Sequence, residues 1–478
     1  TGYDSSVNTE GGSGGSGIVL ISDVPGASLA PTTPSLTYDG YNKLTTVGGA
    51  TQTLYKDSNA YALGTASSVY IADPGEYTYF TRDAATAFLA NVTVGSVSLI
   101  IDFSQSSRVK LISSDGTQIP SGYDIATNPV ASSETTLAVG TTSGNGAIYV
   151  FEKINGVWSQ VQKMTAATPV SSSNFPVSVA ISGDIIVCCT YGPNITDGFV
   201  YVFEKSNGAW PSTETVKIDP GQQRLTDIDI YGTTIVATER HETNLGYFYV
   251  FEKTSGSWPN TYTHRIDTGT DRFTWGCAIH GDNLAITYNV GNPGASSVRT
   301  YERNTSTSTW DYVNTFNNGD TVGYGNFGKN LSIYGNVLAA NAPDDDSNKG
   351  NVYIYKKTNG TWSFDEKISN HGITNERFGI NLELISSTKI IIGSAIHAYL
   401  YEEINGTWVE IFKFEGPGGN NTEFGKYVSA TPDGNTAFVS DRSDNSNTGA
   451  VFVYDKGIID QPPSLAYDGI TNLKITGA

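Results

Sequence analysis

The sequence of 478 residues predicts an all-β protein, a seven-bladed β-propeller preceded by a small β-sandwich. Two observations predict the propeller. A short phrase that is typical of a hairpin recurs at intervals of 46 to 54 residues, and each interval also holds a second pair of strand-like runs. The composition agrees, because charged residues make up only 16% while the chain holds 52 Gly and 28 Tyr, which favours strands and turns over helices.

The recurring phrase reads "GFVYVFEKSNGAW" at residues 198–210 and "GNVYIYKKTNGTW" at 350–362. Its apolar run ends in an aromatic residue at seven positions, Phe151, Phe203, Phe251, Tyr301, Tyr355, Tyr401 and Tyr454. Six copies continue to a tryptophan, at Trp158, Trp210, Trp258, Trp310, Trp362 and Trp408. Asn-Gly between apolar runs predicts a tight hairpin, because both turn residues need positive φ. We expect one strand before the turn and another that begins at the tryptophan.

The other half of each period holds two further strand-like runs joined by a tight glycine turn, as in "VSVAISGDIIVCCTY" (177–191). Each period therefore predicts four antiparallel strands. Both alternating faces are apolar in runs such as 200–203, so both faces of each sheet must be covered. Seven such sheets packed face to face around an axis satisfy this requirement, with the tryptophans packed between blades.

The seventh copy of the phrase has no tryptophan strand after it, so the last blade lacks its outer strand. The segment "VKLI" at 109–112 is similar to the outer-strand ending "TVKI" at 215–218. We expect residues 106–113 to supply the missing strand and close the ring, which removes the open edge of an unfinished propeller.

The pattern Phe327-Gly328, then "NVLAANAP" (336–343), then "GNVYIYKKTNG" (350–360), resembles the FG-GAP repeat. This repeat is the blade of integrin-α-type propellers and of many secreted microbial propellers. The resemblance covers roughly residues 106–457 and implies the fold without specifying a function. Blades of the integrin type often carry calcium between their first and second strands. The corresponding turn "SGD" (182–184) is too short to wrap such an ion.

A different region, residues 30–104, precedes the propeller and reads as six or seven short strands. In it Asp73, Gly75 and Tyr77 have the Asp-x-Gly-x-Tyr spacing of a tyrosine corner. We therefore expect a small immunoglobulin-like β-sandwich there.

The two ends of the chain repeat parts of its middle. Residues 463–478 match 34–50, and residues 17–24 match 449–456. The expected organisation is the end of a preceding repeat or linker at 1–29, the sandwich at 30–104, the propeller at 105–460 and the start of a second sandwich at 461–478. The chain thus has the pattern of one period of a longer tandem protein, or of a subunit linked head to tail in a filament.

The charge balance and apolar pattern exclude two classes of partner. With 28 Lys+Arg against 47 Asp+Glu, the net charge of −19 disfavours nucleic acid. No apolar run has the ~18–20 residues that span a bilayer, so we expect no membrane insertion. Cys188, Cys189 and Cys277 are an odd set in apolar runs, and we expect inert core thiols rather than a redox or metal site.

The sequence holds no catalytic constellation, since its five histidines are scattered over different blades without a metal-binding spacing. We therefore expect no enzyme activity and no cofactor. Binding residues favour long loops on a rigid scaffold. The second-to-third and fourth-to-first connections share one face of the propeller and are the long ones here. The candidate ligand-binding residues lie in the second-to-third connections and are Tyr191, His241, Tyr288 and Asp345.

One of these loops, "NAPDDDSNKG" (341–350), is strongly acidic. Adjacent carboxylates repel unless a cation, a lysine or water screens them. A hard cation such as calcium is one explanation, with Asp344, Asp346 and Asn348 as ligands, and a solvated acidic turn is the other.

Seven Asn-x-Ser/Thr triplets are candidate glycosylation sites, at Asn91, Asn194, Asn304, Asn330, Asn359, Asn405 and Asn420. Together these features predict an extracellular structural or adhesive glycoprotein at a cell or virion surface, a subunit or repeat of a fibre or filament. Its expected partners are other copies or adjacent modules, glycans and a cell-surface receptor. The alternative is a carbohydrate-binding lectin or a carbohydrate-active propeller enzyme.

Overall fold

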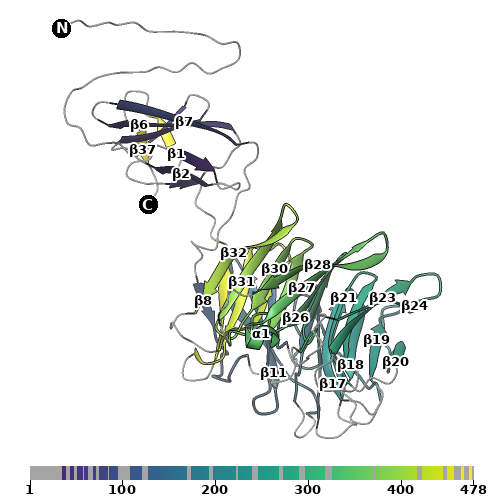
Figure 1. Ribbon diagram of the computed structural model, residues 1–478. Coiled ribbons are helices and arrows are strands. Elements are labelled where there is room, and N and C mark those ends of the chain that lie inside the picture. The colour runs from purple at the N-terminus through teal and green to yellow at the C-terminus, as the bar shows by residue number, and fades with distance from the viewer. Residues whose placement is uncertain are drawn as a thin grey trace, which may run out of the picture. The chain divides into compact units, whose positions relative to one another are not determined.

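The computed structural model forms two compact units, residues 1–105 with 457–478, and residues 106–456 (Figure 1). In the first unit only the backbone of its strands is described. The second is described from 108 to 456 except at 121–127, 170–173, 193–197, 222–223, 240–245, 268–272, 290–295, 318–325, 370–372, 374, 417–422 and 445–448.

The first unit contains two antiparallel sheets in the region predicted as a sandwich. Their orders are β1-β2-β5 and β4-β3-β6-β7. The strands are β1 (Ser35–Tyr38), β2 (Lys43–Val47), β3 (Thr51–Lys56), β4 (Asn59–Ala62), β5 (Ser68–Tyr70), β6 (Gly75–Asp83) and β7 (Thr86–Val94). This number agrees with the predicted six or seven strands. Near the other end, β36 (Leu465–Tyr467) pairs with β37 (Leu473–Ile475), whereas the segment 1–29 lies outside the described residues.

The second unit is a seven-bladed β-propeller, which confirms the propeller part of the predicted fold. Blades 1 to 3 are β9 (Val130–Ser132), β10 (Thr136–Thr141), β11 (Ala147–Ile154), β12 (Val157–Met164); β13 (Val179–Ser182), β14 (Ile185–Cys189), β15 (Val200–Glu204), β16 (Val216–Ile218); and β17 (Leu225–Tyr231), β18 (Thr234–Glu239), β19 (Tyr247–Glu252), β20 (His264–Asp267). Blades 4 and 5 are β21 (Phe273–His280), β22 (Asn283–Asn289), β23 (Ser296–Asn304), β24 (Thr309–Phe316); and β25 (Leu331–Tyr334), β26 (Val337–Ala342), β27 (Asn351–Thr358), β28 (Thr361–Ser369). Blades 6 and 7 are β29 (Asn381–Ser386), β30 (Lys389–Gly393), β31 (His397–Ile404), β32 (Thr407–Glu415); and β33 (Phe424–Ala430), β34 (Thr436–Asp441), β35 (Ala450–Asp455) with β8 (Arg108–Leu111).

The strand that closes the ring comes from the segment predicted for it. β8 pairs antiparallel with β35, with Leu111 opposite Val451 and Arg108 opposite Tyr454. Leu111 is buried in a core shared by blades 1 and 7. The last blade is therefore completed by a strand that precedes the first blade in the chain.

The hairpins between third and fourth strands form as predicted, but two of the fourth strands begin late. Asn155 and Gly156 have φ of 51° and 82°, as a tight turn with two left-handed residues requires. The fourth strand starts near Trp158 in blade 1, whereas β16 starts only at Val216, after Trp210. The physical reason is Pro211, which has no N–H to donate to a ladder. Blade 3 repeats this Trp-Pro arrangement.

The outermost strands carry a recurring β-bulge. In blade 1 the pairing shifts so that Val161 of β12 has no partner of its own between Gln160 and Gln162. The same irregularity occurs in blades 4, 5 and 6. A bulge twists an edge and disturbs its hydrogen-bonding row, so it protects an exposed strand from pairing with another chain.

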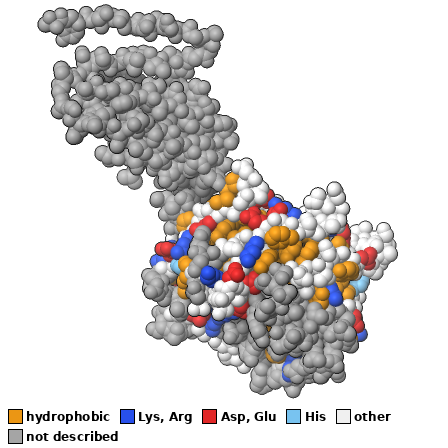
Figure 2. Space-filling model, viewed as in Figure 1, with side chains coloured by type: hydrophobic (Ala, Val, Ile, Leu, Met, Phe, Trp, Pro, Cys, Tyr) orange, Lys and Arg blue, Asp and Glu red, His pale blue; other side chains and the backbone are white. Residues whose placement is uncertain are grey.

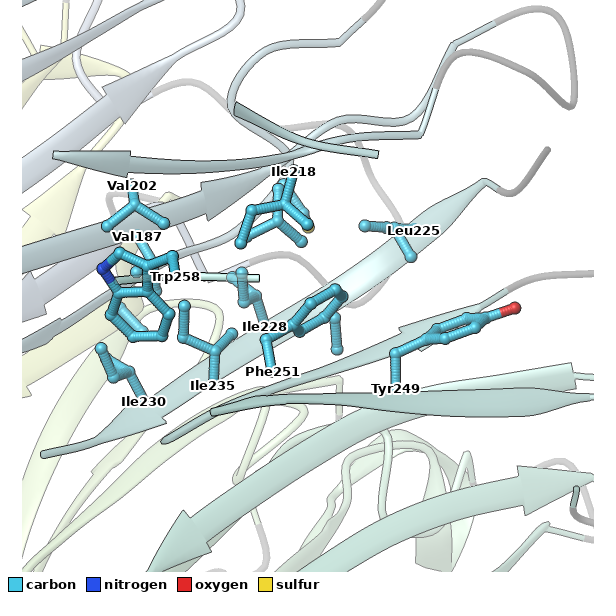
Figure 3. Close-up of a cluster of buried hydrophobic side chains, with 14 of the residues drawn as sticks. Val187, Val202, Ile218, Leu225, Ile228, Ile230, Ile235, Tyr249, Phe251 and Trp258 are labelled. Carbon is cyan, nitrogen blue, oxygen red and sulfur yellow. The ribbon is translucent and has the colours of Figure 1, made fainter. Parts of the chain in front are cut away.

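The core lies between blades, and the tryptophans are part of it, as predicted. Figure 3 shows Trp258 of blade 3 against Val187 and Val202 of blade 2, with Ile230 and Ile235 on its other side. The tryptophan rings of the six blades are between 2% and 8% exposed. Each ring therefore seals the interface with the preceding blade.

The three cysteines are buried and free, which confirms them as core thiols. Burial raises the pKa of Cys188, Cys189 and Cys277, so each stays protonated at neutral pH. The only helix among the described elements, α1 (Asp345–Asn348), has 4 residues, and the described residues hold no helix able to cross a membrane.

Two rings of polar contacts join neighbouring blades. The inner ring lies on the first strands, where a side chain accepts the backbone N–H of the next blade. Examples are Ser182 with Gly232 (2.9 Å), Asp229 with Ile279 (2.8 Å), Ser332 with Leu384 (2.9 Å) and Asn381 with Val428 (3.0 Å). An unpaired buried N–H costs about 1–3 kcal/mol, so these side chains protect the inner edges.

The outer ring consists of ion pairs after the third-strand aromatics. An acid of one blade pairs with a base of the next in Glu152–Lys205 (2.6 Å), Glu204–Lys253 (2.6 Å), Glu252–Arg303 (3.1 Å), Glu302–Lys357 (2.9 Å) and Asp455–Lys153 (2.8 Å). Between blades 5 and 6 the signs are reversed, because Lys356 pairs with Glu403 at 2.8 Å. Figure 2 shows acidic and basic side chains interspersed on the described surface.

Removing the closing strand should destabilise the whole ring. We expect deletion of 106–113 to abolish cooperative unfolding or to cause aggregation, measured by calorimetry and light scattering.

In the intact chain, Leu111→Ala should cost about 2–4 kcal/mol in the free energy of unfolding, because its side chain is buried. Val109→Ala on the same strand is the control, since Val109 is 37% exposed. Unchanged melting of the deletion variant would contradict ring closure by β8.

The reversed ion pair should contribute measurably to stability. A double-mutant cycle with Lys356→Ala and Glu403→Ala should give a coupling of about 1 kcal/mol in urea unfolding, because both groups are partly buried. The more exposed pair Lys413–Glu415 is the control and should give almost none. Equal coupling in both pairs would show that the inter-blade position is irrelevant.

Candidate functional site

The long loops between second and third strands emerge at one end of the propeller, which we call the long-loop face. The hairpins between third and fourth strands lie at the opposite end, because strands alternate in direction. In Figure 1, α1 marks the long-loop end of β26 and β27, and the β27–β28 hairpin projects at the other end. Many long-loop residues, including the predicted ligand-binding residue His241, lie outside the described residues.

In four blades a tyrosine in the third strand binds a carboxylate at the long-loop end. Its hydroxyl donates in the pairs Tyr149–Asp115 (2.8 Å), Tyr249–Glu239 (2.6 Å), Tyr353–Asp345 (2.8 Å) and Tyr399–Glu376. Asp345 lies in a second-to-third connection, Glu239 ends the second strand β18, and Asp115 and Glu376 lie in segments that lead from a fourth strand to the next first strand. Lys163 also donates to Asp115 and holds the pKa of that carboxyl well below its usual range. Burial raises the pKa of Glu239 to about 7, although the Tyr249 hydroxyl opposes the shift. These contacts fix the positions from which the loops leave the scaffold.

The structure does not bring together the three described ligand-binding candidates. Tyr191 follows β14, Tyr288 lies in β22 and Asp345 begins α1, so they belong to blades 2, 4 and 5. Tyr288 is only 6% exposed, with the Arg299 guanidinium 3.9 Å from its ring centroid. Asp345 is likewise buried. Their predicted role in binding stays a prediction, and the side chains of Tyr288 and Asp345 are engaged inside the protein.

The acidic turn at 344–348 is screened by protein cations. Asp344 accepts from Arg377 at 2.7 Å and 2.9 Å, and Asp346 lies 3.5 Å from the Lys367 ammonium group. Asn348 has φ of 65° and donates its backbone N–H to the Asp344 carbonyl. No group of three potential His, Cys, Asp or Glu metal ligands occurs among the described residues. Asp344 and Asp346 are thus paired with cations of the protein, and the metal site at Asp344, Asp346 and Asn348 stays a prediction.

Sequence reasoning missed a polar cluster at the base of the blade 6 loop. One carboxylate oxygen of the buried Glu376 contacts the Tyr399 hydroxyl, the His397 Nδ1 at 3.0 Å and the Ser394 hydroxyl at 3.1 Å. Burial raises the pKa of Glu376, but these three hydrogen bonds outweigh it and lower the pKa overall. The sequence signal is weak, because Glu376 lies in a loop and is separated by a whole hairpin from its partners.

A second feature missed from the sequence is a channel along the propeller axis. It has a volume of about 420 Å3 and is lined by the first strands of the blades. Asp227, Asp229 and Glu383 lie in its wall. The alternation in "TDIDIY" (226–231) indicated a polar strand face, but only the closed ring shows that this face borders a cavity.

The candidate glycosylation sites differ in accessibility. Asn359 and Asn405 are exposed at the tips of third-to-fourth hairpins, with φ of 52° and 53°. Asn304 begins the equivalent turn of blade 4, and its side chain bonds Asp311. Asn330 is half-buried, and its carbonyl oxygen accepts the Leu382 N–H of the next blade. The side chains of the other three, Asn91, Asn194 and Asn420, lie outside the described residues.

The match to a protein-family model agrees with the propeller fold. Residues 158–203, from β12 of blade 1 to β15 of blade 2, match the FG-GAP repeat family. An FG-GAP propeller suggests a fold of the protein-interaction or adhesion type. The WD40 β-propeller domain of Doa1 is similar at a TM-score of 0.45 and 9% sequence identity, over 73% of this chain and 97% of that one. Comparison with curated proteins gives no match.

Because Arg377 balances Asp344, stability should depend on this arginine rather than on a metal. We expect Arg377→Gln to lower the free energy of unfolding by about 1–2 kcal/mol, since it leaves the half-buried turn without its cation. Lys367→Gln is the control, because Asp346 is more exposed and should tolerate the loss. A chelator should leave the melting temperature unchanged. A large drop with chelator, restored by calcium, would contradict this interpretation.

Proposed function

We propose that this chain is a non-enzymatic module of an extracellular structural or adhesive glycoprotein, which contacts its partners through the long-loop face. The observation that carries this proposal is the asymmetry of the propeller. The long loops lie at one end of the propeller, the long-loop face. Short hairpins with exposed glycosylation triplets lie at the opposite end. Such a module presents one face to a partner and covers the other with glycan.

The loop anchors favour recognition by a fixed surface. The Tyr353–Asp345 pair ties the second-to-third loop of blade 5 to its third strand. The other pairs hold the end of β18 or a connection between blades. Loops with fixed bases bind at a smaller entropic cost than free ones. The repeat of this device in four blades supports a contact surface that extends over several blades.

Glycan at Asn359 and Asn405 would leave the long-loop face free. Both residues lie at the end of their blades opposite the loops, in the adjacent blades 5 and 6. The surrounding turns are two-residue hairpins with exposed side chains, which give an oligosaccharide room. This placement supports a glycoprotein that uses its other face for adhesion.

The described carboxylates of the long-loop face favour binding over hydrolysis. A glycosidase needs two carboxyl groups about 5–9.5 Å apart that are open to the substrate. On the described part of the long-loop face, Asp344 is held by Arg377, Asp345 by Tyr353, and Glu376 by Tyr399 with His397. Groups held in this way stabilise the scaffold.

We also propose that the first unit is an immunoglobulin-like sandwich and that sandwich and propeller alternate in a fibre or filament. The two sheets of residues 35–94 and the tyrosine-corner spacing around Tyr77 support the first part. The match of 463–478 with 34–50 supports the second. The partners of one copy are then its neighbours in the fibre and a receptor on a cell surface.

Secretion from a eukaryotic host tests the proposal. Glycopeptide mass spectrometry should find Asn359 and Asn405 occupied, because both are exposed in turns. Asn359→Gln with Asn405→Gln should remove that glycan and leave adhesion to cells unchanged. Asn155→Gln, in the equivalent turn of blade 1 without a triplet, is the control. Unoccupied sites, or hydrolysis of a carbohydrate in a parallel screen, would contradict the adhesive glycoprotein.

A further inference from the structure

The axial channel carries negative groups without a balancing cation in its wall. Asp227 and Asp229 of β17 and Glu383 of β29 line it, and the described residues of its lining include no lysine and no arginine. Small side chains such as Ala131, Ala180 and Ser332 line it too, which leaves a volume of about 420 Å3. A cavity of this size suits a small ligand or a single long side chain.

Aromatic rings surround part of one mouth of the channel. Tyr231, His280 and Tyr334 are the last residues of the first strands in three consecutive blades, just before the tight glycine turns. The His280 ring centroid lies 4.4 Å from that of Tyr231 and 4.6 Å from that of Tyr334. Tyr231 is 43% exposed, so the stack is accessible. Aromatic faces attract cations, most strongly organic ones.

The histidine in this stack is held in its neutral form. Its Nδ1 accepts the Gly335 N–H at 3.2 Å, which places the ring proton on Nε2. Burial also lowers the pKa of His280. The mouth of the channel therefore carries no positive charge at neutral pH that would repel a cation.

The carboxyl groups inside are poised between their two protonation states. Burial raises the pKa of Asp227 and Asp229 to about 7, against hydrogen bonds from Cys277 and Ile279 N–H groups. Burial, with a smaller effect of the Asp229 charge, raises the pKa of Glu383 to about 8. A cation in the channel would favour their ionised forms, and its binding would release protons.

We propose that the axial channel binds an alkylammonium or alkylguanidinium group, which enters past Tyr231, His280 and Tyr334 and pairs with Asp229 and Glu383. A hard metal ion fits less well, because the described residues contain no group of three ligands close enough to hold one. The aromatic rings at the mouth can contact an alkyl chain, and the carboxylates inside can pair with a cationic group at its end. This site is separate from the long-loop face and does not depend on the proposed adhesive function.

Calorimetric titration of the full chain with agmatine at pH 8 tests the site. We expect saturable binding with one site per chain, weakened about tenfold or more by Asp229→Asn and by Glu383→Gln. Asp184→Asn is the matched control, because it removes the same charge from an exposed tight turn outside the channel wall. Equal affinity in all three variants, or no binding of agmatine, would overturn the proposal.

Folding of the variants can be checked by their stability. The folded-state pKa values lie above the ~4 of an unfolded Asp or Glu. The folded protein therefore holds more protons than the unfolded chain from about pH 4 to pH 7–8. As the pH rises through that window, Asp229 and Glu383 lower the free energy of unfolding. At pH 8 each variant should still unfold in one cooperative transition well above the temperature of the titration, so lost binding would not reflect unfolding.

Two further measurements separate the chemistry and source of the ligand. Binding should strengthen from pH 6 to pH 8 and release protons, detected as a dependence of the heat on the buffer.

A peptide with one arginine between glycines should compete with agmatine if the natural ligand is a side chain of a polypeptide. If only free amines bind, the ligand is a small molecule. Binding that is equal at both pH values, or equal for the neutral sugar alcohol sorbitol, contradicts a cation site.

Discussion

The propeller depends on how the inner edge of each blade is satisfied. The first strands border the axis and have no further strand to pair with, so their N–H groups need other acceptors. Side chains of the preceding blade supply them, as Ser182 does for Gly232 and Asn381 for Val428. Between blades 7 and 1 the hydroxyls of Ser132 and Ser429 meet at 2.7 Å. This requirement explains why polar residues recur on strands that are otherwise apolar.

A feature could be predicted from the sequence when it follows from local chemistry or repeat spacing, and not when it depends on a contact between blades. The Asn-Gly turns, the tryptophan packing and the closing strand follow from local chemistry and repeat spacing, and all three could be predicted. The late start of β16 could have been inferred from Pro211, but it conflicts with the repeat, which places a strand directly after Trp210. Polar groups such as Asp229 could not be placed, because their partners lie on another blade 50 residues away.

The candidate sites show where repeat analysis reaches its limit. Of the residues predicted from loop length, Tyr288 and Asp345 are buried, and their side chains contact other groups of the protein. The cluster at Glu376 and the carboxyl groups of the axial channel were not predicted as sites, since each is assembled from segments distant in sequence. Lys356 and Glu403 look like departures from the repeat when taken singly, yet together they form a pair of reversed sign. A consensus of the repeats would remove both departures and with them the pair.

The closing strand has a mechanical consequence. In the antiparallel pair of β8 and β35, Arg108 at the start of one strand lies opposite Tyr454 near the end of the other. The chain therefore enters and leaves the propeller at the same end of this pair. Tension applied to the chain on both sides of the propeller would load these hydrogen bonds one after another, as in unzipping, rather than all at once, as in shear. Blade 7 would therefore open first under load, and the chain would gain length at this strand pair before any other blade gave way.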